Sequence, residues 1–295
     1  MAQIDATADR TRPLDRVPAF GLVGVAIASV QFGSALASKL FSQVGPSGAV
    51  LLRLVSATIV LLALWRPRLT GWSRRELLLA GSFGLVLAGM NLCFYAALHR
   101  IPLGVAVTIE FVGPLTVAIA SSRRRLDLLW VTLAVVGIFA LTHGGTSGLS
   151  GLGILLALLA GGFWGAYILL NSRVGRAFEG GAGLAVAMCV AALVTLPIGV
   201  ADGGSRLLTP RSLLIGSAVG MLSSAIPYSF EVEALRRLDP GVFAVLMSLE
   251  PAVAALAGFL VLGQGLGWRA VFGIVLVVLA SGGASRGTRK APVAV

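Results

Sequence analysis

Charged side chains are scarce in this chain. Only 12% of its 295 residues are Asp, Glu, Lys or Arg, whereas soluble domains carry about 25%, and 57% of the residues are hydrophobic. Of the 12 acidic residues, Asp5, Asp9 and Asp15 lie close together at the start of the chain. Such a composition excludes an ordinary soluble domain and indicates a protein embedded in a membrane.

Cysteine and histidine are rarer still, with two of each. Cys93 and Cys189 lie within apolar runs, so we expect buried small side chains; a disulfide framework or a metal site needs more ligands at closer spacing. His99 and His143 lie at the ends of apolar runs, and no Asp lies at the centre of one. The sequence therefore lacks a constellation for intramembrane hydrolysis, and we predict no metal, no cofactor and no enzymatic activity.

Positive charge is comparatively abundant. The chain has 23 Lys and Arg residues against 12 acidic ones, a net charge of +11. In a soluble protein this excess would suggest nucleic-acid binding, but here the basic residues cluster in short gaps between apolar runs. The enrichment of Lys and Arg in cytoplasmic loops of membrane proteins explains that pattern, so we predict no nucleic-acid partner. The first apolar run lacks the short core and cleavage site of a signal peptide, and we expect it to be retained.

Long hydrophobic runs dominate the rest of the chain. A transmembrane helix needs about 20 mostly apolar residues to cross the hydrocarbon core of a bilayer. Ten runs meet this need, near 18–40, 47–65, 77–98, 104–121, 127–143, 150–171, 181–201, 212–235, 240–263 and 267–283. We predict an all-α membrane protein with ten transmembrane helices and no separate soluble domain.

The basic residues also predict the orientation of these spans. With ten spans, the side that holds the N-terminus carries seventeen Lys and Arg residues, including the cluster Arg123, Arg124 and Arg125, and the opposite side carries five. Arg53 lies within the second run. The bias places both termini in the cytoplasm.

One stretch of the first half, residues 98–118, recurs 137 residues later. In the two copies Glu110 precedes Pro114, and Glu250 precedes Pro251. Five helices in each half force the halves into opposite orientations. We therefore predict two inverted repeats, residues 1–145 and 146–295, an architecture of many secondary transporters that bind substrate between the halves near the bilayer midplane.

Three carboxylates lie deep in apolar runs: Glu110 and Glu250 near the middle of the fourth and ninth, and Glu231 within the eighth. Such groups are costly in hydrocarbon and face the interior of a bundle or a water-filled cavity. One interpretation is that each forms a buried pair with an arginine such as Arg53 and has no other role. The other is that at least one of them takes up a proton or binds a substrate ammonium.

Helical spacing groups further polar and aromatic side chains on shared faces. The candidates for lining a cavity with the carboxylates are Asn91 with Tyr95, Trp164 with Tyr167, Tyr228 three residues before Glu231, Gln31 with Ser34, and Ser248 near Glu250. The aromatic residues have a second interpretation, because rings at membrane depth also fill space or mark the headgroup region.

Prolines interrupt three of the runs. Pro114 and Pro251 are expected to remove a backbone hydrogen bond in the middle of a helix and to allow a bend. Pro227 does the same in the eighth run. A bend beside a carboxylate, at matching places in the two halves, suits a gate, and a fixed kink is the alternative.

Two glycine pairs, Gly161 with Gly165 and Gly216 with Gly220, have the GxxxG spacing. This spacing lets two helices approach closely. We assign both pairs to helix packing alone.

The blocks IASVQFGSALASKLF (27–41), GMNLCFYAALHRIPLGVAVTIEFVGPL (89–115), SSRRRLDLLWV (121–131), WGAYILLNSRVG (164–175), SSAIPYSFEVEALRRL (223–238) and MSLEPAVAAL (247–256) are distributed over both halves. In these blocks the chain resembles the EamA family of the drug/metabolite transporter superfamily, and within it the branch of inner-membrane threonine and homoserine exporters. The resemblance implies export of amino acids or related metabolites from the bacterial cytoplasm, driven by an ion gradient. It also implies a central cavity lined by the first, third, fourth, sixth, eighth and ninth spans.

These observations together predict a proton-coupled amino-acid exporter that works by alternating access. Glu110 is the leading candidate for binding the ammonium or the proton, with Glu231 and Glu250 as further carboxylates. The predicted partners are the substrate and the lipid bilayer, and the expected assembly is a monomer. The alternatives are an exporter of aromatic or other amino acids, of small drugs or of nucleotide sugars, and a structural or receptor-like protein. Nucleotide sugars would require clustered basic residues in the cavity, where only Arg53 is a candidate.

Overall fold

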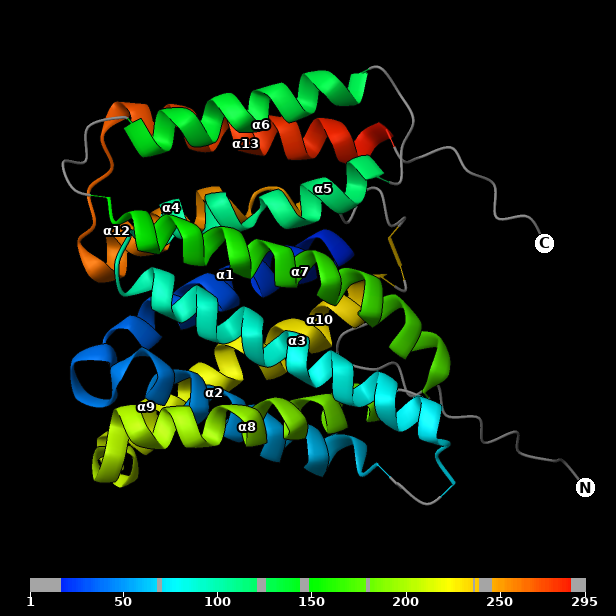
Figure 1. Cartoon of the computed structure of the whole chain (residues 1–295). Helices are drawn as coiled ribbons and strands as arrows, with labels where there is room; N and C mark the ends of the chain where they lie inside the picture. The colour runs from blue at the N-terminus through cyan, green and yellow to red at the C-terminus, as the bar shows by residue number, and fades with distance from the viewer. Residues whose placement is uncertain are drawn as a thin grey trace, which may run out of the picture.

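A computed structural model describes residues 17–67, 71–120, 126–143, 149–178, 181–235, 237–238 and 246–287. Every regular element in these ranges is helical, in agreement with the predicted all-α class. The helices lie side by side with their axes roughly along one direction (Figure 1). The Arg123–Arg125 cluster, the acidic residues near the N-terminus and the beginning of the ninth run lie outside the described residues.

The described helices follow in chain order. They are α1 (Ala19–Ser38), α2 (Phe41–Trp65), α3 (Arg74–Leu98), α4 (Leu103–Glu110), α5 (Val112–Ala120), α6 (Leu126–His143), α7 (Gly151–Ala177), α8 (Ala182–Gly203), the 3-10 turn η2 (Gly204–Leu208), α9 (Pro210–Gly220), the π turn η3 (Met221–Ala225), α10 (Ile226–Leu235), α12 (Glu250–Leu262) and α13 (Trp268–Gly287).

These elements coincide with the apolar runs of the sequence. Within the described residues five helices are long and apolar enough to cross a membrane, namely α1, α2, α3, α7 and the continuous stretch Ala182–Leu208. Four more apolar segments are shorter: Leu103–Val117, Leu129–Ala140, Glu250–Leu262 and Trp268–Ala280. The chain is thus a membrane protein built from long and short apolar helices.

Two of the runs are interrupted at a proline. The run near 104–121 is divided at Phe111, because Pro114 has no N–H with which to bond the carbonyl of Glu110. The run near 212–235 contains the π turn η3, which ends two residues before Pro227, and this proline likewise cannot donate to the carbonyl of Ser223. Both interruptions free backbone carbonyls inside the protein.

Helices from the two halves of the chain interleave. Helix α2 packs on α8, α3 on α7, α4 on α12, and α6 on α13. In Figure 1 the α6–α13 pair lies along one edge of the molecule and α2, α8 and α9 along the opposite edge. The central region therefore contains helices from both halves.

Both predicted GxxxG pairs mediate helix packing. A Cβ atom on Gly161 would lie 2.5 Å from the carbonyl oxygen of Glu110, and one on Gly113 would collide with the backbone of Gly161. In the second pair, Gly216 and Gly220 meet α2 with similarly close approaches. Because Gly161 and Gly113 have no side chains, α7 contacts the α4–α5 junction backbone to backbone.

Two side chains from the second half hold helix starts in the first half. The start of α2 is bent at Gly45, which has φ 70°, and the N–H of Ser47 donates to Asp202 Oδ2 at 2.9 Å. The N–H of Leu103, at the start of α4, donates to Gln264 Oε1 at 3.0 Å. Each contact satisfies a donor that a helix start leaves without an intrahelical partner.

Candidate functional site

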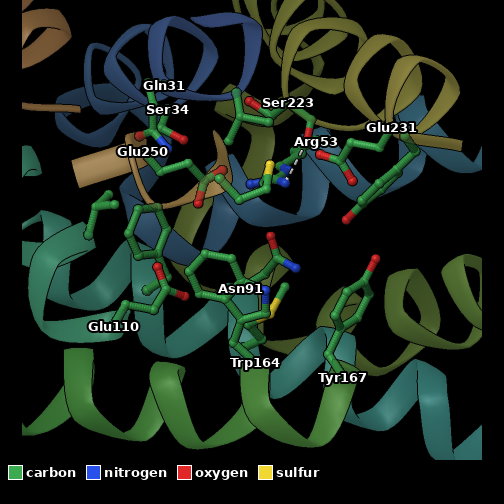
Figure 2. Close-up of a pocket in the computed structure, with 16 residues that line it drawn as sticks. Gln31, Ser34, Arg53, Asn91, Glu110, Trp164, Tyr167, Ser223, Glu231 and Glu250 are labelled. Carbon is green, nitrogen blue, oxygen red and sulfur yellow. Dashed lines mark hydrogen bonds between the residues drawn. The ribbon is translucent and has the colours of Figure 1, made fainter. Parts of the chain in front are cut away.

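A cavity of about 120 Å³ lies in the interior of the helical bundle. It is lined by residues of α1, α2, α3, α4, α7, η3, α10 and α12 and of the segment just before α12 (Figure 2). The lining residues are Val30, Gln31, Ser34, Arg53, Met90, Asn91, Phe94, Val107, Glu110, Trp164, Tyr167, Ser223, Tyr228, Glu231, Met247 and Glu250.

All three predicted carboxylates reach this cavity. Glu110 and Glu250 are 7% and 4% exposed, and Glu231 is half-buried. Figure 2 shows Glu110 and Glu250 extending from different elements toward the same space. Arg53 is the one cationic side chain among the described lining residues. The lining therefore combines three carboxyl groups with one guanidinium in the interior of the protein.

The position of two carboxylates within their helices differs from the prediction. Glu110 is the last residue of α4 and Glu250 is the first residue of α12, whereas both were expected near the middle of a helix. Pro114 is the third residue of α5, and Pro251 lies in the first turn of α12. Proline disfavours helical geometry in the residue before it and is tolerated in the first turn. Each proline therefore lies just after a helix boundary, at which Phe111 and Leu249 keep right-handed helical backbone angles.

Arg53 does not form the buried ion pair that was considered for it, because its hydrogen bonds go to uncharged groups. Nε donates to Ser224 Oγ at 3.3 Å, Nη1 to the Tyr95 hydroxyl at 3.2 Å and Nη2 to the Ser223 carbonyl at 2.9 Å. Within the described residues no carboxylate is ion-paired with it, although Glu110 lies near enough to interact with it electrostatically. Arg53 thus reaches the cavity while tied to α3 and η3.

The π turn explains why carbonyl groups are available to anchor neighbouring side chains. Because Pro227 has no N–H, the Ser223 carbonyl cannot complete the usual helical bond, and it accepts Arg53 Nη2 instead. The adjacent carbonyl of Leu222 accepts the hydroxyl of Ser29 at 2.6 Å. The proline thereby couples η3 to both α1 and α2.

Two lining groups keep unfilled hydrogen-bonding capacity. Gln31 Oε1 and Ser223 Oγ are buried and have no hydrogen-bond partner in the described part of the protein. The Asn91 amide, in contrast, donates to the Leu87 carbonyl at 2.8 Å. A buried polar atom without a partner costs about 1–3 kcal/mol, so these two groups favour a polar occupant of the cavity.

The aromatic candidates on α7 line the cavity. Figure 2 shows Trp164 and Tyr167 rising from one helix toward the space that Asn91 also faces. Trp164 meets Phe111 edge to face, with ring centroids 5.2 Å apart, and Tyr167 stacks on Phe83 at 5.2 Å. Packing against these neighbours fixes the two rings as part of the cavity wall.

The structure brings together most of the predicted site but not all of it. Gln31, Ser34, Asn91, Trp164, Tyr167 and Tyr228 line the cavity with the three carboxylates, as predicted. Tyr95 does not, because it is fully buried behind Arg53 and bonded to it. Ser248 is buried outside the cavity, near Gly282 of α13.

Several lining residues were missed by the sequence reasoning. They are Ser223 and the apolar residues Val30, Met90, Phe94, Val107 and Met247; Arg53 was considered as an ion-pair partner and as the one basic candidate for the cavity. Ser223 could have been found from the sequence, because it lies four positions before Pro227 and its carbonyl therefore lacks the usual helical donor. Its side chain is also polar. The apolar residues resemble any other residue of a membrane helix and carried none.

A strongly apolar, all-helical chain with a charged cavity between helices of its two halves has the construction of a membrane transporter. Residues 151–285 match the EamA-like transporter family. The chain is 41% identical over 270 residues to the threonine/homoserine exporter RhtA of Salmonella typhimurium strain SL1344, covering 91% of each protein. It is 41% identical over 268 residues to the Escherichia coli K12 protein of the same name, covering 90% of each. The chain belongs to the EamA-like transporter family and is a transporter, not an enzyme.

The fold itself has a solved counterpart. A protein of known crystal structure, 16% identical in sequence, superposes with a TM-score of 0.64 over 92% of this chain and 99% of the other. At this identity the likeness concerns the fold alone. It agrees with the helical arrangement of Figure 1.

Proposed function

We propose that the chain exports threonine, homoserine or closely similar small amino acids from the cytoplasm by proton-coupled alternating access in the inner membrane. The observation that carries this proposal is the charge composition of the cavity, with Glu110, Glu231 and Glu250 facing a single arginine. The names of the relatives suggest the cargo, and the cavity has the chemistry to accept it.

The carboxylates supply a binding site for a cation. If all three were ionised, the one positive charge of Arg53 would leave the cavity with a net charge of −2, from three negative charges and one positive. Uncompensated charge is costly away from water. Protons or the ammonium group of an amino acid relieve this cost, and a site that accepts them in turn supports exchange of protons for substrate.

Cavity size favours a small cargo. Pockets for drug-sized ligands enclose roughly 300–1,000 Å³, whereas this cavity encloses about 120 Å³. A small aliphatic amino acid suits this space better than an aromatic amino acid or a drug. The unpartnered Gln31 and Ser223 also favour a cargo that carries a hydroxyl group.

The helix contacts support the proposed inverted repeat of residues 1–145 and 146–295. If α1 corresponds to α7, α2 to α8, α3 to α9–α10, α4–α5 to α12, and α6 to α13, each major contact has a counterpart. The α3–α7 contact corresponds to α1–α10, and α3–α8 to α2–α9, while α2–α8, α4–α12 and α6–α13 correspond to themselves. Counting α4–α5 and α9–α10 as one passage each gives ten proposed passages. With ten passages, the excess of basic residues on one side supports a cytoplasmic location of both termini.

Glu110 remains the leading site for the proton or the ammonium. It is the last residue before the break between α4 and α5, so a change in the angle of these helices moves its side chain. Pro114 and Pro251 follow the two breaks beside carboxylates and are the proposed hinges of the gates.

The test is counterflow in liposomes that contain the purified protein. Vesicles loaded with unlabelled threonine should accumulate external labelled threonine, and homoserine should compete with it more strongly than phenylalanine does. An imposed proton gradient should drive net threonine movement. Exchange of drugs without exchange of any amino acid would refute the proposed function. Counterflow of threonine without net threonine movement under an imposed proton gradient would refute the coupling to protons.

A further inference from the structure

Arg53 is a buried cation whose hydrogen bonds reach no carboxylate in the described part of the chain, although Glu110 interacts with it electrostatically across the cavity. It is 6% exposed, and its three hydrogen bonds go to two hydroxyl groups and one carbonyl. A buried charge that is left without an oppositely charged partner strongly destabilises a protein. The position therefore suits a site whose anion arrives with a ligand.

The arginine also has donors to spare. A guanidinium carries five N–H groups in a planar fork, and three are used by Ser224, Tyr95 and Ser223. Figure 2 shows the Arg53 side chain entering the space shared with Asn91 and Glu250. Carboxylates bind such forks through strong, charge-assisted hydrogen bonds.

We propose that Arg53 binds the α-carboxylate of the cargo while the ammonium group lies among Glu110, Glu231 and Glu250. This inference rests on the proposed function, because it presumes an amino-acid cargo. The two ends of the zwitterion then meet opposite charges, which fixes the direction of the cargo across the cavity. A cargo without the carboxylate offers the remaining N–H groups of the arginine no anionic acceptor.

A purely structural role makes a different prediction. If Arg53 only braces α2 against α3 and η3, its loss changes stability and transport rate for every cargo alike. If it binds the carboxylate, its loss changes which cargo is preferred. Selectivity between two cargoes therefore separates the roles, even where overall activity falls.

The experiment measures competition against labelled threonine in counterflow with the full-length protein. The competitors are threonine and L-threoninol, which keeps the ammonium and the side-chain hydroxyl but replaces the carboxylate with a hydroxymethyl group. The wild type should prefer threonine by on the order of ten-fold or more, the value of one hydrogen bond to a charged group. In Arg53→Gln the two compounds should compete nearly equally.

Tyr95→Phe is the matched control. It removes one hydrogen bond that holds Arg53 and keeps the guanidinium, so the preference for threonine should remain. If the Arg53→Gln protein is too inactive for counterflow, its preference is measured from melting temperatures instead. The concentrations of threonine and of threoninol that raise the melting temperature by the same amount then give the preference for threonine over threoninol. Arg53→Lys, which keeps the charge without the fork, should show an intermediate preference and serves as a second variant if Arg53→Gln does not fold.

A preference for threonine that stays at the wild-type value in Arg53→Gln or Arg53→Lys would overturn the carboxylate site. A wild-type protein that exchanges no amino acid would instead refute the proposed function. The two failures are thus distinguishable within one set of vesicles.

Discussion

The α4–α5 junction and the start of α12 carry similar sequences but present their carboxylates differently. Glu110 closes a helix and is separated from Pro114 by a break, whereas Glu250 opens a helix directly before Pro251. The glutamate–proline pairing recurs in the sequence, yet the side chains leave opposite ends of their helices. The two carboxylates therefore enter the same cavity from different positions relative to their helices.

Packing also distinguishes the two places. Helix α7 meets the first junction at the Glu110 carbonyl itself, through Gly161. In the second half a close glycine contact lies farther along α12, where a Cβ on Gly104 of α4 would be 2.8 Å from the Ala255 Cα. The close glycine contact therefore lies at the carboxylate itself in the first half and farther along the helix in the second.

The largest expected effect comes from exchanging the carboxylates one at a time. We predict that Glu110→Gln lowers threonine counterflow roughly a hundred-fold or more, the scale of removing one partner from a buried charge interaction. Glu250→Gln should reduce transport less and should alter its dependence on pH. Glu76→Gln, at an exposed carboxylate in the first turn of α3, is the control and should transport normally. Transport at the wild-type rate by Glu110→Gln would contradict the assignment of Glu110, and not Glu250, as the leading site for the proton or the ammonium.

The glycine contact at the first junction should be the next most sensitive feature. Gly161→Ala places a methyl group against the backbone of Glu110, and overpacking of this kind costs about 1–3 kcal/mol. Its neighbour Gly162 has open space around it, so Gly162→Ala should cost nothing. Thermal unfolding in detergent measures both, and equal melting temperatures would contradict the proposed backbone contact.

The cap at the start of α4 should contribute less. Gln264→Met removes the acceptor for the Leu103 N–H and should destabilise the protein by about 1 kcal/mol, a typical net value for one hydrogen bond. Gln264→Glu keeps an acceptor and serves as the comparison. Unchanged unfolding in Gln264→Met would show that this link between the halves does not contribute to stability.

The prolines should have the smallest effects on stability. Pro251→Ala should cost about 0.4–1 kcal/mol, chiefly because it gives the unfolded chain more freedom. Pro114→Ala restores a donor that can bond the Glu110 carbonyl and should make the α4–α5 region straighter, with slower transport and little loss of stability. Transport at the wild-type rate in Pro114→Ala would argue against the hinge.

Much of the fold could be predicted from the sequence because apolar runs of membrane length rarely form anything but membrane helices. The positions of the helices followed from those runs, and helical spacing placed Gln31, Asn91 and Tyr167 on cavity-facing sides. The predictions of cavity-lining residues that were wrong concern positions decided by contacts between distant segments of the chain. Tyr95 shares a helical face with Asn91, yet it is fully buried outside the cavity lining, and its hydroxyl accepts a hydrogen bond from Arg53.

The anchoring of Arg53 could not be read from periodicity at all. It requires η3, whose wider turn brings Ser223 and Ser224 to a helix 170 positions earlier in the chain. Similarly, Ser248 is close to Glu250 in sequence, but the backbone turns before α12 and leaves the serine near α13. Local pattern predicts which groups are polar and buried, and tertiary packing decides where they point.

The proline-freed carbonyl of Ser223 has one further consequence, which concerns entropy. A free arginine side chain holds about 2 kcal/mol of rotamer freedom, and immobilising such a side chain during binding subtracts from affinity. Here Ser223, Ser224 and Tyr95 already restrain the side chain before any ligand arrives. A small cargo with few contacts to offer can therefore be recognised without first having to order the group that recognises it.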